Sequence, residues 1–103
     1  MSFINSLKSG HYSGKGFKAA RHKKYKKALY YYELALKYSE HDIDPVLYDS
    51  KAIALYNLNR FDEALINAKK GIEQYNSVKN KDQKIVVRIK ILNEMVQHLE
   101  SEK

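Results

Sequence analysis

An internal repeat with a period of 36 residues constrains the fold of this chain more than any other feature. The segment that starts at Tyr25 returns at Phe61, and the region preceding each copy is repeated with it. The matched pairs are Tyr12 with Tyr48, Gly16 with Ala52, Phe17 with Ile53, Tyr25 with Phe61, Ala28 with Ala64, Leu29 with Leu65, and Leu36 with Ile72. A period of this length indicates stacked copies of one supersecondary unit.

Apolar residues recur at spacings of three and four, which indicates helices. We expect helices at about 10–22, 25–39, 45–58, 61–75 and 83–99, separated by polar connections. Asp44 before Pro45 and Asp82 before the last segment are expected helix caps. The residues expected to be largely buried are Tyr25, Leu29, Leu36, Phe61, Leu65 and Ile72, with Ala28 and Ala64 at close helix crossings.

These repeated residues resemble the tetratricopeptide repeat, a helix–turn–helix unit of about 34 residues. Its Trp place holds Tyr12 and Tyr48, its Gly place Gly16 and Ala52, and its second-helix Ala place Ala28 and Ala64. The sequence departs from the pattern at the Leu place, which holds Lys15 and Lys51, and in a first unit that is longer near His41–Asp44. The resemblance implies an all-α domain over residues 1–103, with antiparallel helix pairs in a short right-handed superhelix. Repeat one covers about 9–42, repeat two about 45–78 and a closing helix about 82–99.

The composition argues against a catalytic or metal-binding site. There is no Cys, so no thiolate or Cys-ligated zinc is available, and the four His residues are scattered. His41 and Asp42 are adjacent, but no spacing supplies three metal ligands on one face. We therefore expect neither an enzyme nor a bound cofactor or metal. No run of residues has the character of a signal peptide or a membrane span, which favours a soluble cytoplasmic protein.

Positive charge is concentrated near the start of the chain. The net charge is +7, and residues 1–32 contain eight Lys or Arg and no acid. Such a region attracts anionic partners. The alternative function is therefore an anionic-surface or RNA-binding module, with a patch of Lys18, Lys23, Lys24, Lys26 and Lys27.

The resemblance favours binding of a protein partner, because the first helices of such arrays line a concave groove. The expected groove residues are Ser13, Phe17, Ala20, Arg21, Asp49, Ser50, Ile53, Tyr56 and Asn57. The expected ligand is a peptide or helix segment, and the expected role is that of an adaptor or scaffold. Two arrangements remain open: the groove is exposed, or it is covered by the final helix or by the segment with Phe3, Ile4 and Leu7.

The final helix is apolar over a wider arc than one-sided packing requires. Repeat arrays usually need three or more units, whereas this chain has two and a closing helix. We therefore predict that the final helices of two chains pair to form a dimer, with Val87, Ile91 and Met95 at the contact.

Overall fold

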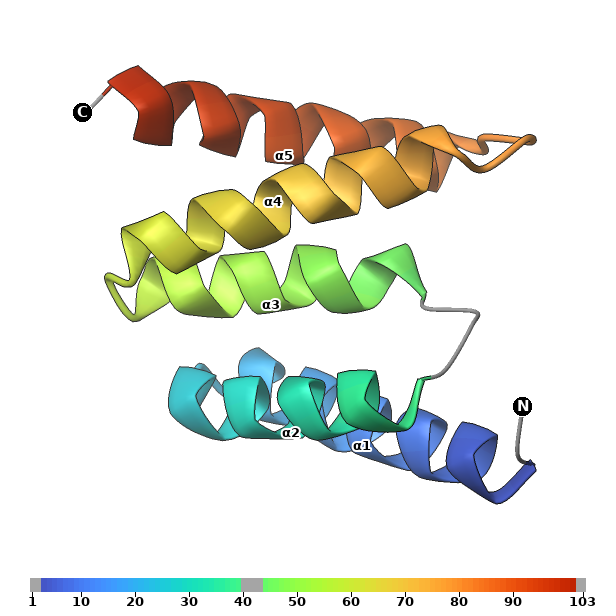
Figure 1. Ribbon diagram of the computed structural model, residues 1–103. Coiled ribbons are helices and arrows are strands. Elements are labelled where there is room, and N and C mark those ends of the chain that lie inside the picture. Colours follow the sequence, from blue (N-terminus) through green and yellow to red (C-terminus); the bar gives the residue numbers. More distant parts are fainter. Residues whose placement is uncertain (1–2, 40–43, 102–103) are drawn as a thin grey trace.

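The computed structural model describes residues 3–39 and 44–101. Within these ranges the chain forms five α-helices and no β-strand. The helices are α1 (Phe3–Arg21), α2 (Tyr25–Tyr38), α3 (Pro45–Asn57), α4 (Phe61–Asn76) and α5 (Gln83–Ser101). Each helix packs against the next one in the chain, with the α1–α2 hairpin at one end of the stack and α5 at the other (Figure 1). The expected all-α fold is confirmed.

Side chains cap the starts of α3 and α5, whereas α2 and α4 begin after Lys24 and Arg60 without a side-chain cap. The Asp44 side chain accepts a hydrogen bond from the Val46 amide at 3.0 Å, and Asp82 caps α5 through the Ile85 amide at 2.9 Å. Both caps agree with the sequence. The expected start near Gly10 is wrong, because α1 begins at Phe3 and continues through the glycines. The expected longer connection near His41 lies outside the described residues.

The two hairpin turns repeat each other. Lys23 and Asn59 both have a left-handed backbone, with φ of 58° and 62°. The residue after each one donates its amide to a carbonyl in the preceding helix at 2.9 Å, Lys24 to Ala19 and Arg60 to Leu55. The same hydrogen bond therefore closes both hairpins, and the period in the sequence is also a period in the backbone.

Small residues allow the helices of each hairpin to approach closely. Ala28 and Ala64 are fully buried, as expected. A Cβ added to Gly16 would lie 2.5 Å from Cε1 of Tyr32, so α1 and α2 meet at a point that tolerates no side chain. Ala52, which matches Gly16 in the repeat, is also fully buried.

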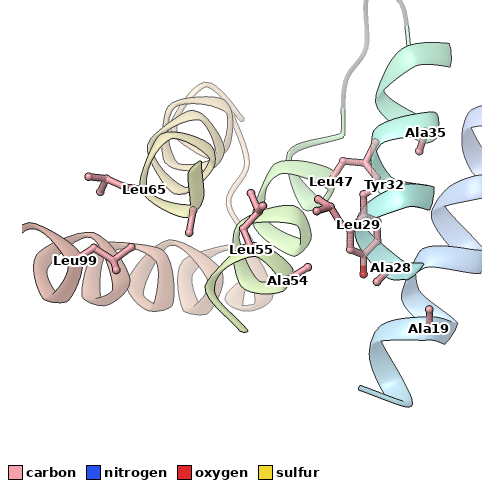
Figure 2. Close-up of a cluster of buried hydrophobic side chains, with 11 residues drawn as sticks. Ala19, Ala28, Leu29, Tyr32, Ala35, Leu47, Ala54, Leu55, Leu65 and Leu99 are labelled. Atoms are coloured by element: carbon pink, nitrogen blue, oxygen red, sulfur yellow. The ribbon is translucent and has the colours of Figure 1, made fainter. Parts of the chain in front are cut away.

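A cluster of buried side chains runs through the stack. Leu29 and Tyr32 of α2 point towards Leu47 of α3, and the cluster continues to Leu99 of α5 (Figure 2). Leu29 and Leu65 are buried as expected, whereas Tyr25, Leu36 and Ile72 are half-buried. The expectation for Phe61 is wrong: it is 43% exposed, because its ring lies edge-on against Tyr56 at the surface of the α3–α4 turn.

The last helix buries one side of its wide apolar arc. Leu92 and Leu99 are buried, and Met95 is half-buried against the core. Val87 and Ile91 are each 44% exposed. Over residues 3–39 and 44–101, no helix has the length and apolarity needed to cross a bilayer.

Candidate functional site

A hollow of about 290 Å³ opens among the first, second, third and fifth helices, and we call it the inner hollow. It is lined by Phe17, Ala20, Arg21, Tyr25, Tyr32, Ser50, Ile53, Ala54 and Arg88. Five of the nine expected groove residues meet here: Phe17, Ala20, Arg21, Ser50 and Ile53. The repeat explains part of this convergence, because Phe17 and Ile53 occupy matched positions in the two units.

The apolar residues of the inner hollow differ in how much they contribute to the core. Phe17 packs on Tyr32, with ring centroids 5.6 Å apart, and so supports the core. Ile53 is half-buried but belongs neither to the two buried clusters nor to the half-buried side chains packed on them. Ile53 is therefore the apolar group of the hollow that contributes least to packing within the described chain.

The polar wall carries positive charge. Arg21 from α1 and Arg88 from α5 both line the inner hollow, and none of its lining residues is acidic. Ser50 hydrogen-bonds the Tyr32 phenol. Burial raises the pKa of that phenol and Asp49 raises it further, whereas the Ser50 hydrogen bond and the charge of Arg88 lower it. The hollow thus combines apolar surface, hydroxyl groups and two guanidinium groups.

Asp49 differs from its expected place in the groove, because its carboxylate is fully buried. One oxygen, Oδ2, accepts hydrogen bonds from the Tyr75 hydroxyl and from Arg88, each at 3.0 Å. Burial raises the pKa of the Asp49 carboxyl, partly offset by the charge of Arg88 and the hydrogen bond from Tyr75. Asp49 therefore positions Arg88 at the hollow and is not itself a contact surface.

Three other expected groove residues lie outside the inner hollow. The Ser13 hydroxyl donates to the Ser9 carbonyl at 2.8 Å, one turn earlier in α1. Tyr56 packs on Phe61 and lies near His98 of α5. Asn57 donates its side-chain amide to the Ile53 carbonyl at 2.8 Å near the end of α3. These side chains are occupied by contacts within or between helices.

Neither expected cover closes the inner hollow. Phe3, Ile4 and Leu7 extend α1 as a helix and are 77%, 62% and 58% exposed. The final helix reaches the hollow through Arg88. Sequence reasoning missed this residue as a site residue, although Arg88 was visible as the one charge that interrupts the apolar arc of the helix.

The expected basic patch divides between two sides of α2. Lys18, Lys24 and Lys27 gather around a second hollow, of about 280 Å³, which we call the basic hollow. Its lining consists of Lys15, Lys18, Ala19, His22, Lys24, Lys27 and Tyr31. Lys26 instead lines a different depression together with Glu33 and Arg60. Lys23 is exposed in the α1–α2 turn and lines neither.

The residues expected to mediate self-association are only partly available. Val87 and Ile91 are exposed one turn apart on α5, but Met95 is turned towards the core. Val86 is 49% exposed on the same helix. The available apolar surface of α5 is thus narrower than the sequence indicates.

No group of three or more His, Cys, Asp or Glu side chains in the described ranges is arranged to hold a metal ion. The adjacent pair His41 and Asp42 lies outside those ranges. The chain matches no protein-family model, and no curated protein or solved structure is significantly similar to it.

Proposed function

We propose that this protein is a protein–protein interaction module that binds a short segment of a partner in the inner hollow. The observation that carries this proposal is the convergence of Phe17, Ile53, Arg21 and Arg88 from three helices around one open concavity. Concave sites with apolar walls and a few oriented polar groups are the usual binding sites on proteins.

We further propose that the chain is a short tetratricopeptide-like array, with α1–α2 and α3–α4 as its units and α5 as the closing helix. Support comes from the matched turns at Lys23 and Asn59 and from the matched small residues at the hairpin crossings. In such an array the first helix of each unit faces the ligand. Phe17 of α1 and Ile53 of α3 both line the inner hollow, which agrees with this arrangement.

The lining of the inner hollow defines the ligand by its chemistry. Phe17 and Ile53 present apolar surface that favours two or three apolar side chains of a ligand. Arg21, and the part of the Arg88 guanidinium that is not bonded to Asp49, favour acidic residues flanking them, because opposite charge guides approach and sets orientation. The expected ligand is therefore a helical or extended peptide with an apolar centre and acidic flanks.

A peptide selection with matched variants tests this proposal. Peptides from a random displayed library are selected on the wild type, and the affinities of the enriched sequences are measured by calorimetry. Ile53→Glu places a negative charge in the hollow, whereas Ile66→Glu places the same charge on α4 at a residue that is 54% exposed. We expect Ile53→Glu to weaken binding at least tenfold and Ile66→Glu to leave it unchanged. Circular dichroism melts check that both variants remain folded.

Charge at the hollow gives a second variant. Arg21 is exposed, so Arg21→Glu should preserve the fold and weaken the binding of acid-flanked peptides. Enriched peptides that lack acids, or that bind Ile53→Glu as tightly as the wild type, would place the partner elsewhere on the molecule.

Self-association through α5 is a second proposed role, favoured by the exposure of Val87 and Ile91. An isologous pairing of two α5 helices would cover these side chains in both copies. Val87 adjoins Arg88, the residue that α5 contributes to the inner hollow, and the two line one depression on α5.

A further inference from the structure

One exposed stripe runs along the whole of α1. Ile4, Leu7, His11, Lys15 and Lys18 follow each other at spacings of three and four, so they lie on one side of the helix. All five are exposed to solvent. The stripe is apolar at its beginning and basic at its end, and it lies outside the inner hollow.

The apolar end is unusually open for side chains of this kind. Phe3, Ile4 and Leu7 occupy the first turns of α1, and each is more than half exposed. Their exposure leaves an apolar tip, defined by these three residues, without a covering element in the described chain. Exposed apolar clusters of this kind usually mark an interaction surface.

The basic end is the basic hollow. Lys15, Lys18 and His22 approach it from α1 and the following turn, and Lys24 and Lys27 approach it from the α2 side. None of the residues that line it is acidic. The Lys15 ammonium lies 5.7 Å from the centre of the Tyr31 ring, so the aromatic wall helps to hold one of the cations in place.

The two ends are separated by a distance that suits a lipid surface. At 1.5 Å per residue, Leu7 and Lys18 lie about 16 Å apart along α1. A helix lying flat in the interface of a membrane can therefore place both ends on the surface at once. Interfacial helices bury an apolar face at the headgroup boundary and keep basic residues near anionic lipids.

We propose that this stripe docks the protein on an anionic lipid bilayer, with the apolar tip between the headgroups and the basic hollow against lipid phosphates. Charge complementarity selects the occupant, because the lining of the basic hollow carries four lysines and no acidic side chain. A single-stranded nucleic acid would satisfy the lysines and stack on Tyr31, but it would leave Phe3, Ile4 and Leu7 exposed to water. A bilayer accounts for both ends of the stripe.

Vesicle sedimentation with charge-matched variants tests the basic end. The wild type is mixed with vesicles of phosphatidylcholine alone or of phosphatidylcholine with phosphatidylserine. One variant changes Lys15, Lys18, Lys24 and Lys27 to Gln, and its control changes Lys26, Lys79, Lys84 and Lys90 to Gln. We expect binding to the phosphatidylserine vesicles only, weakened about tenfold or more by the first variant and much less by the control. Equal losses of vesicle binding in the two variants would mean that only the net charge of the protein matters. This result would overturn the proposal that the basic hollow binds lipid phosphates.

Insertion of the apolar tip into the bilayer is tested by the fluorescence of a Trp introduced there. The chain has no Trp, so a single introduced indole reports its own surroundings. Emission from Phe3→Trp should shift to shorter wavelength when phosphatidylserine vesicles are added, and emission from Ile66→Trp on α4 should not. Phe3→Ser with Leu7→Ser should also weaken vesicle binding, whereas Ile66→Ser with Val86→Ser should not. An unshifted Phe3→Trp emission in vesicle-bound protein would overturn insertion of the tip.

Binding of a labelled oligouridine tests the alternative that the basic hollow binds single-stranded RNA. Suppose that the wild type binds this probe but not the vesicles, and that the variant with the four lysines of the basic hollow changed to Gln no longer binds the probe. The ligand of the basic hollow would then be RNA and not a membrane. The peptide site is independent of this test, because the inner hollow and the basic hollow share no residue. Ile53→Glu should therefore bind vesicles like the wild type.

Discussion

Arg88 of α5 and Asp49 of α3 form an ion pair, with 3.0 Å between Nη1 and Oδ2, that joins the last helix to the second hairpin. The arginine is 44% exposed and the carboxylate only 1%, so the pair connects solvent with the interior. The Tyr75 hydroxyl from α4 donates to the same carboxylate oxygen. Three helices are thus held together by one buried acid.

Removal of Arg88 should destabilise the fold more than removal of a surface ion pair. Arg88→Met keeps the apolar stem but leaves the Asp49 carboxylate with one donor, which should cost about 1–3 kcal/mol. The matched control is Lys69→Met on α4, which breaks the exposed ion pair with Glu100 of α5. Its cost should be below about 1 kcal/mol. Urea unfolding of both variants measures the difference, and equal costs would contradict a role for burial.

The buried Asp49 should make stability depend on pH with a defined sign. Its pKa in the folded chain is raised above the ordinary 3.8, so the folded state holds this proton more tightly than the unfolded state. The resulting stability is fully present below pH 3.8 and is lost as pH rises through the raised pKa.

Asp49→Asn isolates this effect, because other titrating groups cancel in the comparison with the wild type. The free energy of unfolding of the wild type minus that of the variant should fall as pH rises from about 4 towards neutrality. Urea titrations across this range measure it. A difference that grows with pH would mean that the Arg88 charge outweighs burial and that the pKa is lowered.

Two glycines of α1 should respond oppositely to the same substitution. Gly16→Ala drives a methyl group into the Tyr32 ring and should cost about 1–3 kcal/mol. Gly14→Ala meets nothing within 4 Å and should stabilise the helix by about 0.5–1 kcal/mol. Thermal melts compare them directly. Similar shifts of both melting temperatures would show that α1 and α2 do not approach closely at Gly16.

Pairing of α5 helices should be sensitive to one exposed side chain. Sedimentation velocity at micromolar concentration should show a dimer for the wild type and a monomer for Ile91→Glu, because the charge would be buried against its copy. Ile66→Glu adds the same charge on α4 and should remain dimeric. A monomeric wild type at high concentration would exclude this pairing.

The helices, the two caps and the repeat could be read from the sequence because their causes are local. Asp44 and Asp82 bond amides two and three residues ahead, and the helix periodicity needs only near neighbours. The period that relates Tyr25 to Phe61 also relates the hairpin turns, so it predicted two similar pairs of helices and placed Phe17 and Ile53 on the same side.

Only the tertiary structure decided which side chains share a site. Asp49 and Arg88 are 39 residues apart, so nothing in the local pattern marked the aspartate as buried. Lys26 and Lys27 are neighbours in the sequence, but successive helical residues point about 100° apart, and they line different hollows. Phe61 matches Tyr25 in the repeat, yet Phe61 is 43% exposed at the α3–α4 turn, whereas Tyr25 is half-buried. Burial and site membership depend on what distant segments place nearby, and a single sequence does not record that placement.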